Sequence, residues 1–442
     1  MALRGQRTDD GQAEFNAPKW NFREPYVNVS AGVSDAASRD RETIRPDVEL
    51  ARFREIKKIR QMLEDGCRDK LFTNLPKMAL ERWLIEQATV PYEPSKRKMD
   101  PLLRKPDDAG VVRREIEFEI PKRIYGMRQR KDIKRLRENL NEYCAAARDW
   151  LRRLGTEKNI EDLLQEAEKQ SNLAMDESDP IVKADILEKA LIMLRDTASP
   201  MVRLKVKPVL DELMSSVEKQ AQDAVDRLWK MRHETKRDET KQVTLFYPHG
   251  ERSHFRIGSP VVVKYDEDEL YITTGHVLKL RSLYTLRMRR DKSESAKGIE
   301  VDESVESEPK GFLDAVYQLV RRYTTFIAKA GQMQAAAPED VFEAMREDFG
   351  VCMESFGSPL NCYFQRFGSA FPDTDVHFGS VGSFFRNEPV EGSFETGPPY
   401  VKETMDRMAV RLDKLLAASN RPLSFIVFVP DWYVFYLLRI FS

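Results

Sequence analysis

The order in which sequence patterns follow one another is the strongest constraint on the fold of this chain. Apolar residues recur at helical spacing from Val48 and Ile56 onward, and a long helical tract runs from about Arg128 to Trp229. After Lys241, short runs of β-branched and aromatic residues appear, such as Pro260–Tyr265, with further helical stretches between them. A chain that is helical first and then alternates strands with helices is expected to be an α+β protein whose sheet lies in its second half.

Local signals predict where individual elements begin and end. Gly66 is expected to end the first helix, and the alternation of charged and hydrophobic residues from Arg113 to Pro121 predicts a strand. The helical tract is expected to break near Gly155, Asp179-Pro180 and Ser199-Pro200. The other predicted elements are helices at 76–87, 312–333 and 338–350 and strands at 255–257, 260–265, 270–272 and 278–280.

These patterns divide the chain of 442 residues into consecutive parts. Residues 1–45 are polar and contain few aliphatic side chains, so they are expected to be disordered. Residues 46–241 form a helical domain, and residues 242–442 form a second domain that contains the strands. Within the second domain, residues 291–309 are acidic and rich in serine, which is typical of a flexible loop.

Composition excludes several classes of protein. Hydrophobic residues make up 41% of the chain, as in a globular protein. The net charge is -1, from 72 basic and 73 acidic residues, so a nucleic-acid surface has to be a local patch. The cysteines and histidines show no spacing typical of metal ligands or of a disulfide framework, so no metal site is expected. Neither a secretory signal nor a membrane-spanning run is visible, which predicts a soluble protein of the cytosol or nucleus.

One short segment carries a chemical signature. Gly397-Pro398-Pro399-Tyr400 has the form of a motif of adenine-N6 methyltransferases, in which Asp, Asn or Ser precedes Pro-Pro-aromatic. In that motif a side-chain oxygen and a backbone carbonyl accept hydrogen bonds from the exocyclic amine, while the aromatic ring stacks on the flipped base. The other interpretation is an ordinary polyproline-like turn, since Gly397 has no side-chain oxygen.

Further motifs surround this segment in a definite order. They are Glu354–Phe364, Ser369–Asp375, Phe378–Ser380 and Pro422–Trp432. The whole series closely resembles the phosphorylated-CTD-interacting factor family, the cap-specific methyltransferases that modify N6 of a 2'-O-methylated adenosine beside the mRNA cap. The resemblance is dense from about Val351 to Trp432. It implies a mostly helical N-terminal domain packed on a class I Rossmann-like methyltransferase domain, with the ligand at the carboxyl ends of the strands.

The resemblance also implies a set of site residues, with the tetrapeptide Gly397–Tyr400 in the catalytic position. The residues expected to contact the cofactor S-adenosyl-L-methionine are Ser358, Asn361, Phe378, Gly379 and Ser380. The residues expected to contact capped RNA are Arg82, Arg113, Lys402 and Trp432. Taken alone, Phe378–Gly382 is also explained by a Gly-Ser turn, and Ser358-Pro359 by a helix N-terminus. The basic residues between Lys122 and Arg137 suit either phosphate contacts or a solvated helix face.

The chain departs from the family pattern at several positions. Gly397 replaces the residue with the acceptor oxygen, Lys402 stands where the family has an acidic residue, and Val381 follows Phe-Gly-Ser in place of a basic residue. No pair of tryptophans at WW spacing is present, and the family pattern does not continue after about Trp432. These departures predict a divergent member without the WW domain, with an incomplete methyltransferase domain that is truncated after about residue 432.

The expected function is S-adenosylmethionine-dependent N6 methylation of 2'-O-methyladenosine next to the mRNA cap, with activity weak or lost. The alternative is a catalytically inactive protein of the methyltransferase fold that binds capped RNA or the RNA polymerase II transcription machinery. A third class is a helical scaffold without RNA contacts. The expected partners are the capped 5' end of mRNA and, through the family relationship, the phosphorylated tail of RNA polymerase II. The expected location is the nucleus.

Overall fold

The computed structural model describes residues 43–92, 96, 99–118, 133–155, 157–248, 258–295, 309–327, 337–431 and 433. The fold is α+β, as predicted, with helices in the N-terminal part and a parallel sheet near the C-terminus. The chain divides into two compact units, each built from segments that are not contiguous. The sheet unit comprises Met1–Ile56, Leu84–Pro106 and Gln222–Ser442, and the helical unit comprises Lys57–Trp83 and Asp107–Ala221. The predicted domains at 46–241 and 242–442 are drawn from the order of helices and strands along the chain, and their limits stay a prediction.

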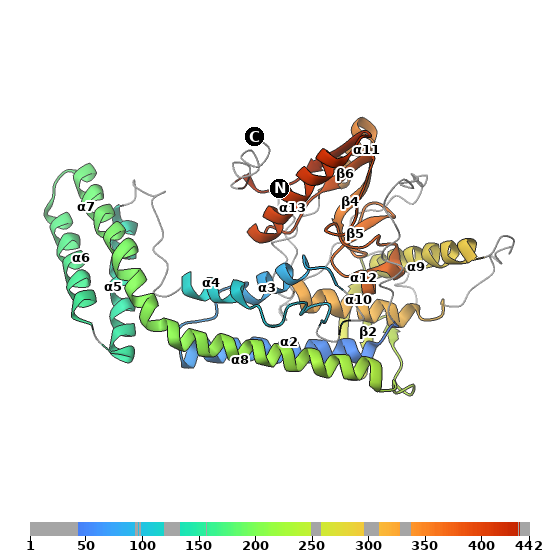
Figure 1. The fold of residues 1–442 in the computed structure, drawn as a ribbon, viewed down its shortest axis with the longest axis horizontal. Helices are drawn as coiled ribbons and strands as arrows, with labels where there is room; N and C mark the ends of the chain where they lie inside the picture. The colour runs from blue at the N-terminus through green and yellow to red at the C-terminus, as the bar shows by residue number, and fades with distance from the viewer. Residues whose placement is uncertain are drawn as a thin grey trace. The chain divides into compact units, whose positions relative to one another are not determined.

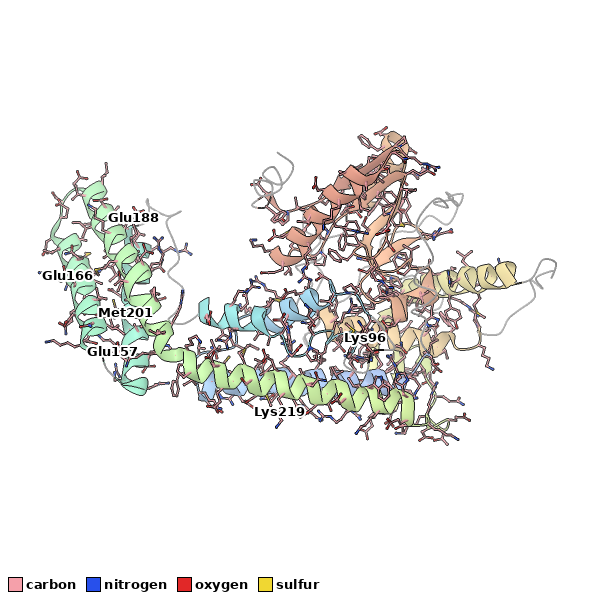
Figure 2. All side chains as sticks on the ribbon, viewed as in Figure 1. Lys96, Glu157, Glu166, Glu188, Met201 and Lys219 are labelled. Atoms are coloured by element: carbon pink, nitrogen blue, oxygen red, sulfur yellow. The ribbon has the colours of Figure 1, made fainter. Side chains whose placement is uncertain are left out.

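Helices dominate the first half of the chain. They are α2 (Pro46–Asp69), α3 (Ala79–Gln87), α4 (Gly110–Phe118), α5 (Ile133–Leu154), α6 (Lys158–Asp176), α7 (Pro180–Met193) and α8 (Ser199–Glu234) (Figure 1). In the helical unit, α5, α6 and α7 bury apolar side chains against one another, among them Leu140, Leu164 and Leu187. Figure 2 labels Glu157 at the start of α6, where its carboxylate forms an ion pair of 2.9 Å with Lys205 of α8.

The predicted breaks in the helical tract are confirmed at two positions. Gly155 has a φ of 98°, a left-handed conformation that suits glycine and ends α5. Asp179 caps α7, since its side chain accepts a hydrogen bond of 2.8 Å from the backbone N–H of Ile181. The break predicted at Ser199-Pro200 is wrong, because the π-helical segment Leu194–Ala198 joins α7 to α8 without interruption. Proline has no N–H to donate inside a helix, and the π-helical turn just before Pro200 is where the hydrogen-bond pattern changes.

Two other local predictions are also wrong. Gly66 lies inside α2, where a Cβ atom would come within 2.3 Å of Cδ1 of Leu213, so this glycine allows close packing and does not end the helix. The segment predicted as a strand from Arg113 to Pro121 is helical as far as Phe118, and the remaining positions lie outside the described residues. Val112 and Ile116 are buried there, and their spacing of four residues places them on one face of α4.

A three-stranded antiparallel sheet begins the second half of the chain. It consists of β1 (Thr244–Phe246), β2 (Pro260–Tyr265) and β3 (Asp268–Thr273), which confirms the strand predictions at 260–265 and 270–272. The strand predicted at 278–280 is wrong, because those residues belong to α9 (Thr274–Ser295). Helix α10 (Phe312–Ile327) follows, and Tyr317 and Arg321 on it both donate hydrogen bonds to the Asp268 carboxylate. The predicted strand at 255–257 lies outside the described residues.

The second sheet has four parallel strands in the order β5-β4-β6-β7. Figure 1 labels β4, β5 and β6 of this sheet. They are β4 (Val351–Gly357), β5 (Phe367–Ser369), β6 (Gly392–Thr396) and β7 (Leu423–Val427). After β4 the chain places β5 on one side of it, and β6 then lies on the other side. The topology therefore reverses its direction at β4, and in open α/β sheets this switch point is where ligands bind, beyond the carboxyl ends of the strands.

Helices cover both faces of the parallel sheet. Alternate residues of β7 show this: Phe425 packs with Met408 and Leu412 of α13 (Lys402–Ala418), while Ile426 packs with Phe342 of α11 (Glu339–Phe349). Side chains of a strand point alternately to its two faces, so one strand contacts both helices. Helix α11 ends at Gly350, whose φ of 65° gives the left-handed cap. This doubly covered parallel sheet is consistent with a Rossmann-like methyltransferase fold.

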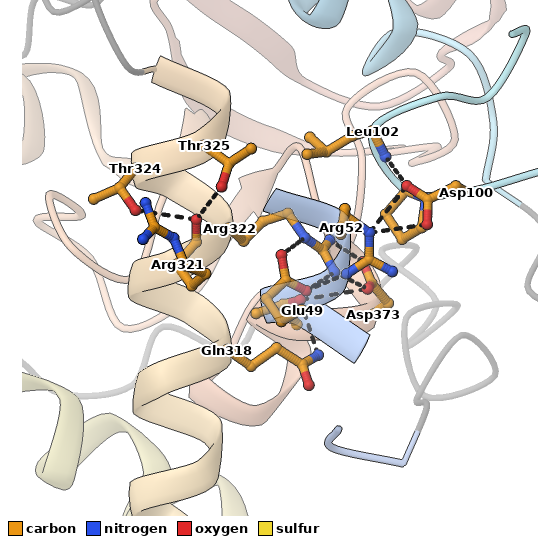
Figure 3. A network of polar contacts seen from close by, with 12 residues as sticks. Glu49, Arg52, Asp100, Leu102, Gln318, Arg321, Arg322, Thr324, Thr325 and Asp373 are labelled. Carbon is orange, nitrogen blue, oxygen red and sulfur yellow. Dashed lines mark hydrogen bonds and ion pairs between the residues drawn. The ribbon is translucent and has the colours of Figure 1, made fainter. Parts of the chain in front are cut away.

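A buried ion network holds the segment after β5 (Figure 3). Arg322 of α10 donates hydrogen bonds of 2.8 Å to Glu49 and 2.9 Å to Asp373, and Arg52 pairs with Glu49 and with Asp100. Burial raises the pKa of Asp373, but the Arg322 guanidinium outweighs it, so the pKa of this carboxyl lies below its usual range. Asp373 belongs to the short helix α12 (Pro372–Asp375), so the network positions the chain that leaves β5.

Candidate functional site

An open pocket lies at the carboxyl ends of β4, β5 and β6 in the sheet unit. The strands contribute Glu354–Gly357, Ser369 and Ala370, and Glu395 with Gly397 and Pro399. Other segments of the same unit complete the lining with Ile85, Ala88, Thr89, Tyr323, Phe326, Ala337, Phe342, Asn361, Ser383, Phe384, Phe385 and Thr404. The pocket therefore occupies the switch point of the sheet.

Two buried carboxyl groups stand next to each other at this end of the sheet. Glu354 of β4 and Glu395 of β6 are paired in the parallel ladder. Burial raises the pKa of Glu354 to about 7, although backbone N–H groups of Phe364 and Tyr363 donate to its Oε2 and lower it. Burial, and after it the Glu354 carboxyl, raises the pKa of Glu395 well above its ordinary value. Such a pair favours a ligand that brings positive charge or hydrogen-bond donors.

Gly397 opens the loop between β6 and α13, and Glu395 occupies the space beside it. A Cβ atom on Gly397 would lie 2.6 Å from Oε1 of Glu395. The Glu395 side chain therefore extends from β6 toward the position that a side chain at 397 would take. The absence of a side chain at Gly397 therefore leaves room for the Glu395 carboxyl.

The wall of the pocket is aromatic on one side. The rings of Phe356 and Phe384 lie 5.0 Å apart, and that of Phe385 lies 5.6 Å from Phe384. All three residues line the pocket, so it offers apolar surface to a flat ligand. Thr404 in the first turn of α13 also lines the pocket; it is buried, and its Oγ1 has no hydrogen-bond partner among the described residues. An unpaired buried hydroxyl is available to a ligand.

The expected site residues of the tetrapeptide and of the β4 end meet at this pocket. Gly397 and Pro399 line it, and Pro398 and Tyr400 belong to the same short loop. Asn361 also lines the pocket, and its Oδ1 accepts hydrogen bonds of 2.9 Å and 2.7 Å from the backbone N–H and the hydroxyl of Ser358. Ser358 thus holds Asn361 in a turn, and the chain forms no helix there.

Phe378, Gly379 and Ser380 do not belong to the pocket lining. A Cβ atom on Gly379 would lie 2.7 Å from the backbone oxygen of Gln365, and φ at Gly379 is 100°, so the glycine serves a close approach of two backbone segments. Ser380 contacts the pocket through Ser369, because their hydroxyls lie 2.7 Å apart. Contacts of these residues with a cofactor stay a prediction.

Most of the residues expected to contact RNA are paired with acidic side chains, and one lies outside the described residues. Arg82 pairs with Glu115 and Arg113 with Asp211, all within the helical unit. Lys402 at the start of α13 pairs with Asp406, and so does the hydroxyl of Tyr433, at 2.7 Å. Trp432 lies outside the described residues, as do the basic positions before Ile133 in the 122–137 segment.

Sequence reasoning missed the acidic pair and Thr404. Glu354 and Glu395 each interrupt a strand of otherwise apolar or small residues, and a charge at such a position was the available signal. No local sequence pattern indicated that the two glutamates are close together, because they are 41 residues apart in the sequence. Thr404 resembles any polar residue in the first turn of a helix.

Two further features of the described residues concern membranes and metals. None of the helices there is long and apolar enough to cross a membrane. No cluster of three or more potential metal ligands occurs among those same residues.

Comparison with known proteins adds three similarities. A family model described as "Phosphorylated CTD interacting factor 1 WW domain" matches residues 279–439. The mouse protein named mRNA (2'-O-methyladenosine-N(6)-)-methyltransferase is 29% identical over 98% of this chain and 62% of its own length. The human protein of the same name is 30% identical over 96% of this chain and 61% of its own length. The chain thus spans about three fifths of these relatives, and the similarities support the family that the motifs indicated.

The family match corrects two expectations. The chain was expected to lack the WW domain and to be truncated after about residue 432, and both expectations are wrong because the matched region runs from 279 to 439. Residue 433 is the one described position beyond 431. Tyr433 is fully buried, and its hydroxyl donates to Asp406 of α13.

Proposed function

We propose that this chain is an S-adenosylmethionine-dependent methyltransferase of the phosphorylated-CTD-interacting factor family, acting on N6 of 2'-O-methyladenosine beside the mRNA cap. The observation that carries the proposal is the pocket at the switch point, which joins the end of β4 to the loop Gly397–Tyr400. The names of the two mammalian relatives support the same reaction.

The residues of the pocket fit the cofactor. S-adenosylmethionine supplies, when bound, an electrophilic methyl group on a positively charged sulfur, and its amino group is a second positive charge. Glu354 offers a buried carboxyl that suits these charges, and Phe356 and Phe384 offer a flat apolar wall for an adenine ring. Asn361 and Thr404 add hydrogen-bonding groups.

The residues of the chain contribute mainly positioning. Transfer of a methyl group to an aromatic amine needs no metal, and it proceeds when the amine nitrogen is held in line with the methyl carbon. The proline residues Pro398 and Pro399 stiffen the loop that presents the backbone carbonyl and the Tyr400 ring to the base. The cover of helices α11 and α13 keeps the strand ends rigid, because both faces of the sheet are packed.

The proposed substrate is the capped 5' end of mRNA, and a nuclear location is proposed with it. A relation to the phosphorylated tail of RNA polymerase II is proposed from the description of the family model. The surface that binds the cap is not part of this proposal, because Arg82, Arg113 and Lys402 are each paired with a carboxylate.

A second candidate function is binding of capped RNA without methylation. Gly397 favours it, since the motif position lacks its own acceptor and the loss of one pre-positioned group lowers the rate by roughly 100- to 1000-fold in other enzymes. The same observation makes weak activity the expected result if the chain is an enzyme.

The test is transfer of label from S-adenosylmethionine to RNA by the purified chain. The substrate is a capped RNA that begins with 2'-O-methyladenosine, and the controls are the uncapped RNA and a capped RNA that begins with guanosine. Label on N6 of the first adenosine alone, at well under about 1 turnover per second, is the expected result. Capped RNA that binds without incorporation of label supports the second candidate, and no binding of either ligand overturns both.

A further inference from the structure

We propose that the Glu395 carboxyl accepts a hydrogen bond from the exocyclic amine of the substrate adenine, in place of the side chain that position 397 lacks. This assignment rests on the proposed function. It concerns a residue that stands outside the Pro-Pro-aromatic motif, and it makes Glu395 a substrate-contacting residue.

The Glu395 carboxyl lies beside Gly397. Its Oε1 lies 2.6 Å from the place of a Cβ atom on Gly397, so the carboxyl begins where a motif side chain would begin. Both residues line the pocket. An acceptor at this place is as close to the loop Gly397–Tyr400 as the missing one would be.

The Glu395 carboxyl is available to a ligand in the pocket. Among the described residues no hydrogen-bond donor contacts Glu395, whereas Oε2 of the neighbouring Glu354 already accepts the backbone N–H groups of Tyr363 and Phe364. A carboxyl that lines an open pocket can accept an N–H group from a ligand. The two glutamates therefore have different roles, and Glu395 is the one left for a ligand.

A carboxyl can accept a hydrogen bond in both of its protonation states. In its neutral form a carboxyl keeps a carbonyl oxygen that accepts a hydrogen bond, and in its ionised form both oxygens accept. Glu395 is therefore an acceptor in either form. An adenine amine, with two N–H donors, satisfies it, whereas a purine without the amine leaves it unpaired.

The structure also explains why an acceptor cannot simply be added at position 397. Any side chain there meets Oε1 of Glu395, so the two acceptors exclude each other unless one side chain moves. Removing the carboxyl makes room for the other. This relationship allows a rescue experiment.

The experiment measures equilibrium binding of two capped oligonucleotides in the presence of S-adenosylhomocysteine. One begins with 2'-O-methyladenosine, and the other begins with the same nucleotide lacking the N6 amine. We expect the unaltered chain to prefer the first by roughly tenfold, Glu395→Ala to bind both equally, and Glu395→Gln, which keeps an oxygen acceptor, to retain the preference. The double variant with Glu395→Ala and Gly397→Asn is expected to regain it.

Controls separate the possible failures. Glu388→Ala removes an exposed carboxylate outside the pocket and should leave the preference unchanged. Calorimetric binding of S-adenosylhomocysteine to each variant verifies that the pocket is intact. If the unaltered chain binds both oligonucleotides equally, or if Glu395→Ala keeps the preference, the role of Glu395 is overturned while the proposed function stands. If the unaltered chain binds neither the cofactor product nor capped RNA, the proposed function fails and this inference with it.

Discussion

Oε1 of Glu395 lies 2.6 Å from the position that a Cβ atom on Gly397 would take. The Glu395 carboxyl therefore fills the space that a side chain at position 397 would need. A change at either position alters the space available to the other, and the first prediction uses this dependence.

Gly397→Asn alone is expected to destabilise the chain by about 1–3 kcal/mol, because the new side chain overlaps the Glu395 carboxyl and forces one of them to move. Adding Glu395→Ala should restore most of the lost stability. Chemical denaturation of the two variants is the measurement. A single variant as stable as the unaltered chain would show that Glu395 moves aside at no cost.

Stability is expected to fall as the pH rises from about 4.5 to about 7. The pKa of Glu354 is about 7 in the folded chain and 4.5 in its ordinary state, so in this interval the unfolded chain releases a proton that the folded chain keeps. At about 1.4 kcal/mol per pKa unit, the contribution lost is about 3 kcal/mol. The contribution is complete below pH 4.5 and gone above pH 7.

The variant Glu354→Gln isolates this effect. Its amide oxygen still accepts the N–H groups of Tyr363 and Phe364, but it does not titrate. The difference in unfolding free energy between the variant and the unaltered chain should therefore grow in favour of the variant between pH 4.5 and pH 7. Parallel curves over this range would contradict the raised pKa.

Binding of S-adenosylmethionine is expected to tighten as the pH rises through about 7. A cationic ligand favours the ionised carboxyl, so binding should release a proton from Glu354. Calorimetry in two buffers with different heats of ionisation measures the number of protons released. A heat that is the same in both buffers at pH 6.5 would speak against this coupling.

The buried network around Arg322 is expected to be necessary for the fold of the sheet unit. Arg322→Ala leaves Glu49 and Asp373 without their shared partner, and uncompensated buried charges cost about 3–5 kcal/mol. The matched control is Arg421→Ala, which removes a half-exposed ion pair with Glu391 and should cost at most about 1 kcal/mol. If thermal unfolding shows that the two variants lose the same amount of stability, burial does not determine how much these ion pairs contribute.

Packing inside α2 gives the last prediction. Gly66→Ala places a Cβ atom 2.3 Å from Cδ1 of Leu213 and should destabilise the helical unit by about 1–3 kcal/mol, despite the better helix propensity of alanine. Gly258→Ala, where nothing lies within 4 Å, is the control and should change little. A stabilised Gly66→Ala variant would mean that Leu213 readily adopts another rotamer.

Local periodicity predicted much of the fold correctly. The β-branched run Pro260–Tyr265 is a strand, and the helical spacing from Phe312 predicts α10. The failures share one cause. The segments at 113–118 and 278–280 mix charged and apolar residues over too few positions to separate a period of two from one of 3.6, and packing decided both in favour of helix.

The motif series placed part of the site. Gly397, Pro399 and Asn361 line one pocket because each follows closely on the carboxyl end of a strand, and parallel strands bring these ends together. Arg82 and Arg113 stand in the other compact unit, each with its own carboxylate partner.

The sequence by itself determined the α+β class, the position of the Pro-Pro loop after a strand and the absence of an acceptor at Gly397. Only the tertiary structure decided that Glu354 and Glu395 are neighbours and that a carboxyl fills the space beside Gly397. The reason is that the pairing of parallel strands joins residues far apart in the chain. Which residues face each other then depends on the packing of the whole sheet against α11 and α13, which no local pattern contains.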